Sequence, residues 1–424
     1  MNFIEELKWR GMIHDMMPGT EEALLAKSSA GYIGFDPTSD SLHIGSLVQI
    51  MTLVHFQRAG HKPIALIGGA TGMVGDPSGK SHERNLLDQE TIAVNIRGVQ
   101  TQLEKFLDFE GVNSAEVINN MDWFGEMNFL DFIRDAGKHI SVNYMLAKDS
   151  VKSRLETGMS FTEFTYQLVQ GYDFFHLNQH KNCIVQLGGS DQWGNIVTGT
   201  ELIRRKGGQP AFAVTTPLIK KADGSKFGKT ESGNIWLDPK KTSPYAFYQY
   251  WLNISDEDAA SFIKIFTLFS KEDIDALQAE HLQAPHLRLL QKRLAEDITE
   301  RVHGSKALRK VISASKILFG KSTKEDIMSL SDEDFLAVFD GVPQAVISRA
   351  DLDQEISIID ALVSKSGFLK SNGEARRELK GNSISVNKER VTDVFQLSKA
   401  NLINDKYILL GKGKKTNFVL RIEG

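Results

Sequence analysis

The alternation of apolar and polar segments between residues 30 and 67 predicts a strand, a helix and a second strand. The apolar segment GYIGF is followed by the polar segment PTSDS, and then by apolar residues that recur at helical spacing, namely Leu47, Ile50, Met51 and Val54. Gly60 is placed to end that helix, and the uninterrupted run IALI suits a buried parallel strand. The pattern therefore indicates a βαβ unit with a right-handed crossover.

A second unit of the same kind begins near Ser160. We expect a helix from there through His176, the strand CIVQL, the glycine-rich turn GGSDQWGN and a helix over IVTGTELIRRK. This alternation of helices with short apolar strands predicts an α/β fold with a Rossmann-like, doubly wound parallel sheet.

The pattern changes twice after this α/β region. Beyond about Pro244 the strand signals fade, and segments such as DAASFIKIFTLF and KEDIDALQAEHL carry helical periodicity. From about Ile356 two short helices and several strand-like segments indicate a small α+β module. We therefore expect an α/β domain over 1–225, a loop and linker over 226–243, a helical domain over 244–330, a linker over 331–350 and the small module over 351–424.

The composition fits a folded protein of several domains. Hydrophobic residues make up 41% and charged residues 25% of the 424 residues, which are ordinary values for globular proteins. Cys183 is the only cysteine, which excludes an internal disulfide and a zinc site built on several thiolates. The first residues are charged and amphipathic, and no run reaches the roughly 18 apolar residues of a membrane span. We expect a cytoplasmic protein that does not cross a membrane.

The charge is distributed unevenly along the chain. The formal net charge is −4, yet Lys and Arg outnumber Asp and Glu between residues 351 and 424. An acidic body with a mildly basic tail permits contact with RNA without requiring it.

The glycine-rich segment GATGMVGDPSGKS superficially matches a phosphate-binding P-loop. The spacing is wrong, because the pattern GxxxxGK[ST] that ends at Lys80 requires glycine at position 74, which is Val74. This disfavours a P-loop kinase. The glycines still mark a strand-to-helix turn that a ligand or a helix approaches closely.

Two short motifs lie at opposite ends of the predicted α/β region, one after its first strand and one after its last. The segment DPTSDSLHIGS places His43 and Gly45 at the start of a helix, where free N–H groups and the helix dipole favour a phosphate. Taken alone, the segment is better explained as a capped helix start with an exposed histidine. The segment KADGSKFGKT places Lys226, Lys229 and Thr230 on a glycine-containing loop, which suits either a clamp on phosphates or a solvated turn.

Together the two motifs resemble the paired signatures of class I aminoacyl-tRNA synthetases. The longer segments GYIGFDPTSDSLHIG, GGATGMVGDPSGK, SFTEFTYQLVQGYDF, QLGGSDQWGN and KFGKTESGNIWLDPKKTSPY resemble bacterial tyrosyl-tRNA synthetases, and the resemblance covers the whole chain. One position departs from the family pattern His-x-Gly-His, because Ser46 stands where the second histidine is common. That histidine contacts the substrate near the adenosine, so its role does not carry over directly to Ser46.

The resemblance implies an ATP-dependent tyrosine–tRNA ligase that first forms tyrosyl-adenylate and pyrophosphate, with Mg²⁺ accompanying ATP. The tyrosine carboxylate attacks the α-phosphorus in line, so the protein's work is positioning and charge stabilisation. By resemblance, the groups that hold the phosphates are Thr38, His43, Lys80, Arg84, Lys226, Lys229 and Thr230. Those implied around the ribose and adenylate are Asp36, His43, Ser46, Gly189, Asp191 and Lys229.

The predicted helix that begins near Ser160 has a polar face with Tyr166, Gln170 and Asp173, and a separate apolar face with Phe161, Phe164 and Leu168. Taken alone, this is an amphipathic helix that shows its polar side to water. The resemblance instead places the polar face at the tyrosine pocket. It implies that Tyr166, Gln170, Asp76 and Gln192 surround the substrate's ammonium group and backbone, and that Tyr32 and Asp173 reach its phenol.

The resemblance also covers the C-terminal half. It implies an anticodon-side helical domain, an S4-like RNA-binding domain at 351–424, a homodimer, and tRNA(Tyr) as the partner that receives tyrosine at its 3′ end. Candidate phosphate contacts in the tail, each of which alone could be a solvated charge, are Arg376, Arg377, Lys380, Lys388, Lys412, Lys414 and Lys415.

Two alternatives remain open at this point. A tryptophanyl-tRNA synthetase shares the fold and signatures, although Tyr32 with Asp173 argues against it. A catalytically silent relative that binds structured RNA is disfavoured by the intact KFGKT and kept open by Ser46.

Overall fold

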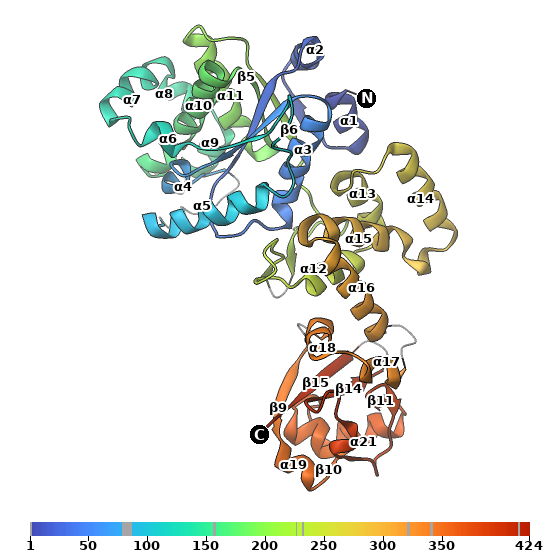
Figure 1. Ribbon diagram of the computed structural model, residues 1–424. Coiled ribbons are helices and arrows are strands. Elements are labelled where there is room, and N and C mark those ends of the chain that lie inside the picture. Colours follow the sequence, from blue (N-terminus) through green and yellow to red (C-terminus); the bar gives the residue numbers. More distant parts are fainter. Residues whose placement is uncertain are drawn as a thin grey trace. The chain divides into compact units, whose positions relative to one another are not determined.

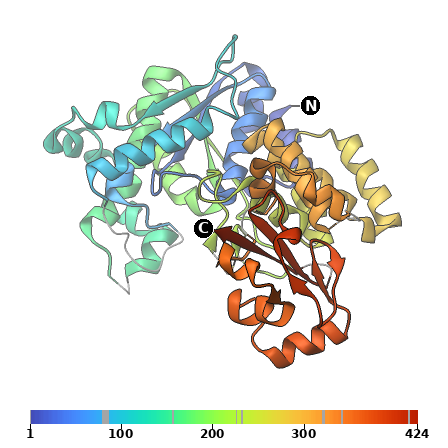
Figure 2. The same cartoon turned by 60° about the horizontal axis from the view of Figure 1, so that its bottom comes forward.

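The computed structural model describes residues 2–78, 87–155, 158–225, 227–230, 233–319, 323–339, 342–413 and 416–424. It divides into two compact units, one made of Met1–Lys241 with Ile254–Leu294, and one of Thr242–Asn253 with Ala295–Gly424. Figures 1 and 2 show both units from two directions. Among the described helices, none is long and apolar enough to cross a membrane.

The first unit is built on a six-stranded sheet with the order β1-β6-β5-β2-β3-β4. Its strands are β1 (Asp15–Met16), β2 (Ala30–Phe35), β3 (Lys62–Ile67), β4 (Glu116–Asn119), β5 (Cys183–Gly189) and β6 (Phe212–Thr216). Neighbouring strands from β2 to β6 are parallel, and only β1 pairs antiparallel, with β6. The chain builds the sheet outward in opposite directions from β2 and β5, so the topological switch point lies between these two strands.

Helices cover both faces of this sheet (Figure 1). Right-handed crossovers place α3 (Leu47–Arg58) and α5 (Gln89–Leu103) on one face, and α10 (Phe161–Lys181) and α11 (Trp193–Arg205) on the other. The core under α10 and α11 joins Tyr32, Leu66 and Cys183 of the sheet to Phe174 and Ile203 of these helices. The unit's remaining helices are α1 (Phe3–Arg10), α2 (Thr20–Ala26), α4 (Thr71–Val74), α6 (Met121–Phe124), α7 (Phe129–Asp135), α8 (Val142–Leu146), α9 (Asp149–Leu155), α13 (Asp256–Phe266) and α14 (Lys271–Gln283).

The predicted α/β elements are confirmed. The expected strand, helix and strand between residues 30 and 67 are β2, α3 and β3, and the expected second unit is α10, β5 and α11. The helix that starts after Ser160 continues beyond His176 to Lys181, and Asn182 in the left-handed conformation ends it.

The second unit contains α12 (Pro244–Leu252), the end of α15 (Leu289–His303), α16 (Ser305–Phe319) and a C-terminal α+β module. The module has a five-stranded sheet with the order β12-β11-β14-β15-β9. Its strands are β9 (Gln344–Ser348), β11 (Ile384–Val386), β12 (Glu389–Arg390), β14 (Tyr407–Lys412) and β15 (Thr416–Glu423), and β10 (Ile356–Ser357) pairs separately with β13 (Gln396–Leu397). Its short helices include α17 (Lys324–Met328), α18 (Asp332–Val338), α19 (Arg349–Asp353), α20 (Ile358–Asp360) and α21 (Asn372–Lys380).

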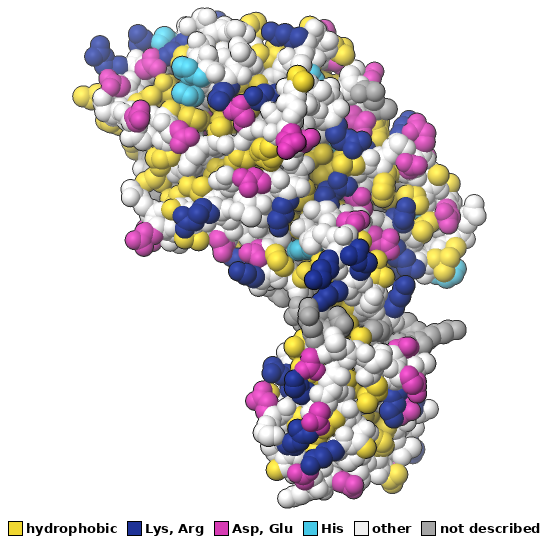
Figure 3. All heavy atoms as spheres, in the orientation of Figure 1, with side chains coloured by type: hydrophobic (Ala, Val, Ile, Leu, Met, Phe, Trp, Pro, Cys, Tyr) yellow, Lys and Arg dark blue, Asp and Glu magenta, His cyan; other side chains and the backbone are white. Residues whose placement is uncertain are grey.

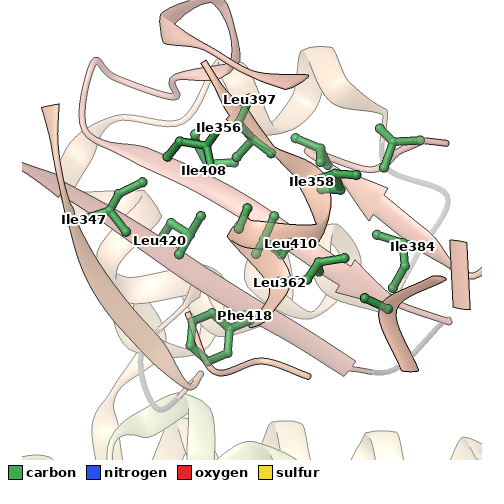
Figure 4. Packing of buried hydrophobic residues seen from close by; sticks show 14 of the residues in the cluster. Ile347, Ile356, Ile358, Leu362, Ile384, Leu397, Ile408, Leu410, Phe418 and Leu420 are labelled. Carbon is green, nitrogen blue, oxygen red and sulfur yellow. The ribbon is translucent and has the colours of Figure 1, made fainter. Parts of the chain in front are cut away.

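The module has its own hydrophobic core. Leu410 and Leu420 from the central strands pack with Ile358 and Leu362 from the helical segment, and Ile347 of β9 closes one side (Figure 4). Such a core, formed within one segment of chain, is typical of a separately folding module.

Residues 331–350 differ from the expected linker. They contain α18 and β9, and β9 pairs in parallel with β15 from Val419↔Gln344 to Glu423↔Ser348. The pairing of the five-residue strand QAVIS cannot be read from the sequence, because the strand is short and its partner lies 75 residues further along the chain, from Gln344 to Val419.

Candidate active site

A pocket of about 340 Å³ lies at the carboxyl ends of β2 and β5. This is the topological switch point of the sheet, where ligands bind in open α/β folds. Among the predicted site residues, the pocket is lined by Tyr32, Asp36, Thr38, His43, Ser46, Asp76, Tyr166, Gln170, Asp173, Gly189, Asp191 and Gln192. The structure thus brings together residues that are up to 160 positions apart in the sequence.

Tyr32 and Asp173 form the deep end of this pocket, and both side chains are about 1% exposed. Asp173 Oδ2 accepts a hydrogen bond from Asn120 Nδ2 at 3.1 Å, and its Oδ1 accepts one from Trp123 Nε1 at 3.0 Å. The Trp123 ring in turn stacks on His176, with 4.3 Å between ring centroids. Asn120 and Trp123 therefore fix the orientation of the Asp173 carboxylate.

Burial governs the ionisation of this pair. Loss of solvent raises the pKa of Asp173 well above its usual range, although the hydrogen bonds from Asn120 and Trp123 oppose the shift. Burial also raises the pKa of Tyr32, and the nearby Asp173 adds to that rise. Tyr32 therefore stays a neutral hydrogen-bond donor. A ligand group that donates a hydrogen bond to Asp173 stabilises its ionised carboxylate.

A chain of hydrogen bonds joins the two walls of the pocket. Tyr166 Oη donates to Asp36 Oδ2 at 2.8 Å, and Thr71 Oγ1 donates to Asp36 Oδ1 at 2.7 Å. Asn120 Nδ2 reaches Thr71 Oγ1 at 3.2 Å as well as Asp173. The network therefore connects α10, the end of β2 and the segment after β4 into one rigid frame.

Asp76 is held on the opposite side by an amide pair from the start of α11. Gln192 Nε2 donates to Asp76 Oδ2 at 2.8 Å, and Asn195 Nδ2 lies 3.4 Å from Asp76 Oδ1. Asp76 Oδ1 also accepts the backbone N–H of Ser78 at 2.9 Å. This wall presents a fixed carboxylate to the pocket, which suits a positively charged ligand group.

Four polar side-chain atoms in the pocket walls have no hydrogen-bond partner within the described residues. They are Tyr32 Oη, Gln49 Oε1, Gln170 Oε1 and Gln186 Oε1. Buried polar atoms are almost always paired in folded proteins, and each unpaired one costs about 1–3 kcal/mol. Four such atoms around one cavity indicate a site preorganised for a polar ligand.

The signature loop, residues 36–45, forms the outer rim of the pocket. His43 Nδ1 accepts the backbone N–H of Gly45 at 3.0 Å, so the neutral imidazole carries its proton on Nε2 and acts there as a donor. Ser46 lies at the N-terminus of α3 and also lines the pocket, without capping the helix through its side chain. These donors sit at a helix N-terminus, which favours an anionic group.

Gly228, the described glycine of the lysine loop (residues 226–230), lies close to the signature loop. Gly228 adopts a φ of +85°, and a Cβ there would lie 3.2 Å from Ile44 Cγ1. The segment after the loop pairs with the signature loop, since Ile44 N donates to Ile235 O at 3.0 Å. The two motifs that were recognised separately in the sequence therefore meet in the fold.

Several predicted residues lie outside this description. Lys80, Arg84, Lys226, Lys414 and Lys415 are not among the described residues, and Lys229 and Thr230 are described only as the backbone of β7 (Lys229–Thr230), which pairs with β8 (Gly233–Asn234). Their roles stay predictions.

The predicted phosphate contacts of the tail fall into two groups. Arg376, Arg377 and Lys380 are exposed on α21. Lys412 instead pairs with Glu374 at 2.9 Å and Glu378 at 3.1 Å, and Lys388 is partly buried. Figure 3 shows basic and acidic side chains interspersed on the visible face of the module.

Sequence reasoning missed Asn120, Trp123, Thr71, Gln49 and Gln186. Asn120 and Trp123 come from the short α6 region, which has no periodic pattern, and Gln186 lies inside an apolar strand. Only Gln186 could have been found from the sequence, because a glutamine within the buried strand CIVQL needs a hydrogen-bond partner.

Comparison with known proteins agrees with this geometry. Residues 26–320 match the family described as tRNA synthetases class I (W and Y), and residues 334–420 match the tyrosine–tRNA ligase SYY-like C-terminal domain. The chain is 61% identical to the tyrosine–tRNA ligase of Flavobacterium johnsoniae over 99% of both chains. It is 57% identical to that of Bacteroides fragilis over 99% of both chains.

A solved structure shows the same fold over the N-terminal part. The C-terminally truncated mitochondrial tyrosyl-tRNA synthetase of Coccidioides posadasii is 31% identical, with a TM-score of 0.66, and covers 73% of this chain and 91% of its own. The family match and the full-length identity to known tyrosine–tRNA ligases point to the same family, and the chain belongs to the tyrosine–tRNA ligases, within the class I aminoacyl-tRNA synthetases.

Proposed function

We propose that the pocket of the first unit activates L-tyrosine with ATP and then transfers it to tRNA(Tyr). A tyrosine carboxylate oxygen attacks the α-phosphorus, the bond to pyrophosphate breaks, and tyrosyl-adenylate remains. A hydroxyl of the terminal adenosine of the tRNA then attacks the tyrosyl carbonyl, and AMP leaves. The observation that carries this proposal is the set of unpaired polar atoms beside a buried carboxylate in a cavity of about 340 Å³.

The phenol of tyrosine fits the deep end of the pocket. Asp173 accepts a hydrogen bond from the phenol hydroxyl, and the unpaired Tyr32 Oη provides a second hydrogen bond to the same phenol oxygen. At the other end, Gln170 Oε1 and the Asp76 carboxylate suit the ammonium group; Gln192 orients that carboxylate, and Tyr166 lines the same pocket. Tyrosine has a donor at both ends, its phenol hydroxyl for Asp173 and its ammonium group for Asp76 and Gln170 Oε1. Its phenol oxygen accepts the hydrogen bond from Tyr32.

The phosphates of ATP fit the rim where the two signatures meet. His43 and Thr38 lie on the signature loop, and Lys229 and Thr230 lie on the loop whose Gly228 contacts Ile44. Lys80, Arg84 and Lys226 belong to this proposal by resemblance. Mg²⁺ would accompany the triphosphate. By resemblance, the pocket-lining residues Asp191, Gly189 and Ser46 belong to the adenosine site of this proposal.

Transfer requires contacts with tRNA beyond the pocket. We assign this to the C-terminal module, in which Arg376, Arg377 and Lys380 present three positive charges on α21. The reaction belongs in the cytoplasm, where ATP and tRNA are supplied, and the buried lone thiol of Cys183 suits that reducing compartment.

A homodimer is part of the proposal. Helices α7, α8 and the start of α10 line an apolar groove of about 830 Å³. Its exposed side chains include Phe129 at 63%, Val142 at 59% and Phe161 at 68% exposure. A contiguous apolar surface of this kind is typical of an interface with another protein. A second copy of the same chain, related by a two-fold axis, would bury it.

The direct test is exchange of labelled pyrophosphate into ATP, measured with each of the twenty amino acids. We expect exchange with tyrosine that requires Mg²⁺, and none with tryptophan. Absence of tyrosine-dependent exchange by the intact protein would favour the RNA-binding alternative.

A further inference from the structure

Helix α5 turns a polar face toward the interior of the first unit. Asn95 and Gln102 are only 5% and 7% exposed, and together with Gly98 they occupy positions i, i+3 and i+7 of one helical face. Figure 2 shows α5 as a long light-blue helix. Buried polar residues on a helix need partners, and here the partners all come from one loop.

The α5 brace, defined as Asn95, Gly98 and Gln102, holds the signature loop at three successive points. Asn95 Nδ2 donates to Pro37 O at 2.9 Å. A Cβ at position 98 would overlap the backbone oxygen of Asp40, so only glycine permits this approach.

Gln102 completes the brace with both ends of its amide. Its Oε1 accepts the backbone N–H of Leu42 at 2.8 Å, and its Nε2 donates to Ser41 Oγ at 3.0 Å. The loop is thus bonded to α5 on each side of the segment that presents Thr38 to the pocket.

Ser41 links this brace to the segment that follows the lysine loop. Its Oγ accepts the backbone N–H of Asp238 at 3.2 Å, and Leu237 N donates to Leu42 O at 2.9 Å. Ile235 of the same segment donates its N–H to Gly228 O, within the lysine loop, at 3.2 Å. One hydroxyl therefore receives hydrogen bonds from both α5 and the strand-like segment 235–238.

We infer that Asn95 and Gln102 are positioning residues for adenylate formation, and that the Gln102–Ser41 hydrogen bond sets the signature loop against the segment of the lysine loop. This inference rests on the proposed function, because it assumes that the two loops handle the triphosphate. Misplacement of reacting groups by about 1 Å can reduce a rate roughly a hundredfold. The α5 brace fixes the backbone of the signature loop, and so fixes where the loop presents its side chains to ATP, without contacting the substrate itself.

The brace acts on one end of the pocket only. The tyrosine end is framed by Asn120, Trp123 and Thr71, none of which contacts α5 through a hydrogen bond among the described residues. Loss of the brace should therefore weaken the chemical step and leave tyrosine binding intact, which a general loss of stability would not do.

The test compares Gln102→Met with Gln100→Met. Methionine keeps the length of glutamine and removes both hydrogen bonds, and Gln100 is an exposed residue of the same helix that bonds only to Glu104 among the described side chains. The rate of adenylate formation at saturating substrates is measured by rapid quench, and tyrosine affinity by equilibrium dialysis. If Gln102→Met does not fold, Ser41→Ala replaces it in the test, because this smaller change also removes the Gln102–Ser41 hydrogen bond.

We expect Gln102→Met to slow adenylate formation between about tenfold and about a hundredfold with tyrosine affinity within about twofold of wild type. The effects of Gln102→Met and Ser41→Ala should be less than additive, because the two changes share the loss of the Gln102–Ser41 bond. A full rate per folded site in Gln102→Met, or an equal loss of tyrosine affinity, would overturn the inference. Lack of tyrosine-dependent activity in wild type and Gln100→Met would instead overturn the proposed function.

Discussion

Tyr32 carries a hydroxyl that is buried without a partner in the described structure, and this predicts opposite effects on stability and on function. Tyr32→Phe removes an unpaired polar atom, so the melting temperature should stay unchanged or rise. The same change removes one hydrogen bond to the substrate phenol, which is worth about 0.5–1.5 kcal/mol. The ratio of activation efficiencies, tyrosine over phenylalanine, should fall by up to roughly tenfold.

Tyr245→Phe is the matched control, because Tyr245 lies on α12, outside the pocket. It should leave that ratio unchanged. An unaltered ratio in Tyr32→Phe would show that the phenol is read elsewhere.

Asp173 predicts how tyrosine affinity depends on pH. Burial raises the pKa of its carboxyl, so the free protein binds a proton there at a pH above the usual aspartate range. A phenol that donates to the ionised carboxylate lowers this pKa, so tyrosine affinity should increase as pH rises through the pKa of the free protein. The unliganded protein should lose stability over the same window, because its ionised carboxylate is desolvated.

Equilibrium dialysis of tyrosine over a range of pH that starts at the ordinary aspartate pKa, about 4, and extends upward measures this dependence. Asp173→Asn should flatten it, since the amide does not titrate. A constant affinity in wild type across that range would contradict the assignment of Asp173 as the phenol acceptor.

At the level of residues, the sequence predicted the side chains that line the pocket better than the side chains that hold them in place. Tyr166, Gln170 and Asp173 follow helical spacing, and resemblance assigned them to tyrosine. Asn120 and Trp123 hold Asp173 from a segment about 50 residues away, without a local pattern. Such supporting contacts depend on the tertiary fold, so no spacing rule finds them.

The position of α10 depends on a buried ion pair at its first turn. Arg154 of α9 donates to both oxygens of Glu163, at 3.1 and 2.9 Å, and the two residues are 4% and 3% exposed. Breaking a buried pair from one side costs about 3–5 kcal/mol, so Arg154→Met should lower the melting temperature markedly. Arg204→Met is the control, because Arg204 forms a pair with Glu201 while 70% exposed, and such pairs contribute about 0–1 kcal/mol. Equal effects would show that burial does not strengthen the Arg154 pair.

Helix α21 predicts the salt dependence of tRNA binding. Neutralising Arg376, Arg377 and Lys380 to glutamine should reduce the slope of log affinity against log salt by about one unit for each phosphate that the helix no longer neutralises. Pyrophosphate exchange should be unaffected, because the pocket lies in the other unit. Lys412→Gln is the control on the same module, and its slope should match wild type because Glu374 and Glu378 already pair with this lysine. Equal slopes in wild type and the triple variant would remove α21 from the RNA surface.

At the level of elements, the apolar pattern predicted α3, α10, α11 and the parallel strands β2, β3 and β5. It did not predict β1 or β9. Both are short edge strands whose partners, β6 and β15, lie far away in the sequence. The pairing of such strands is decided by the assembled sheet, which the local pattern does not encode.

At the scale of the whole molecule, the pocket of the first unit is held by hydrogen bonds within that unit, whereas the apolar groove and helix α21 are surfaces for which we propose partners. The pocket is framed by hydrogen bonds from β2, α4, α6 and α10, all within the first unit. Domain organisation from the sequence was informative about the order of modules, since helical and α+β segments follow the α/β region. It could not predict that Thr242–Asn253 joins the second unit while Ile254–Leu294 joins the first, because this division depends on contacts between distant segments.

The apolar groove of α7, α8 and α10 gives the last prediction, which concerns assembly. In a two-fold dimer the same patch lies on both sides of the interface, so one substitution places two charges there. Phe161→Asp and Val142→Asp should each convert a dimer to a monomer, because these residues are 68% and 59% exposed in the single chain and would bring like charges together in the dimer. Light scattering coupled to size exclusion at micromolar concentration measures the mass. Leu282→Asp is the control, since Leu282 is 77% exposed on α14, away from the groove, and should leave the dimer intact. A monomeric wild-type protein, or a dimer that survives both substitutions, would show that this groove does not pair two copies of the chain.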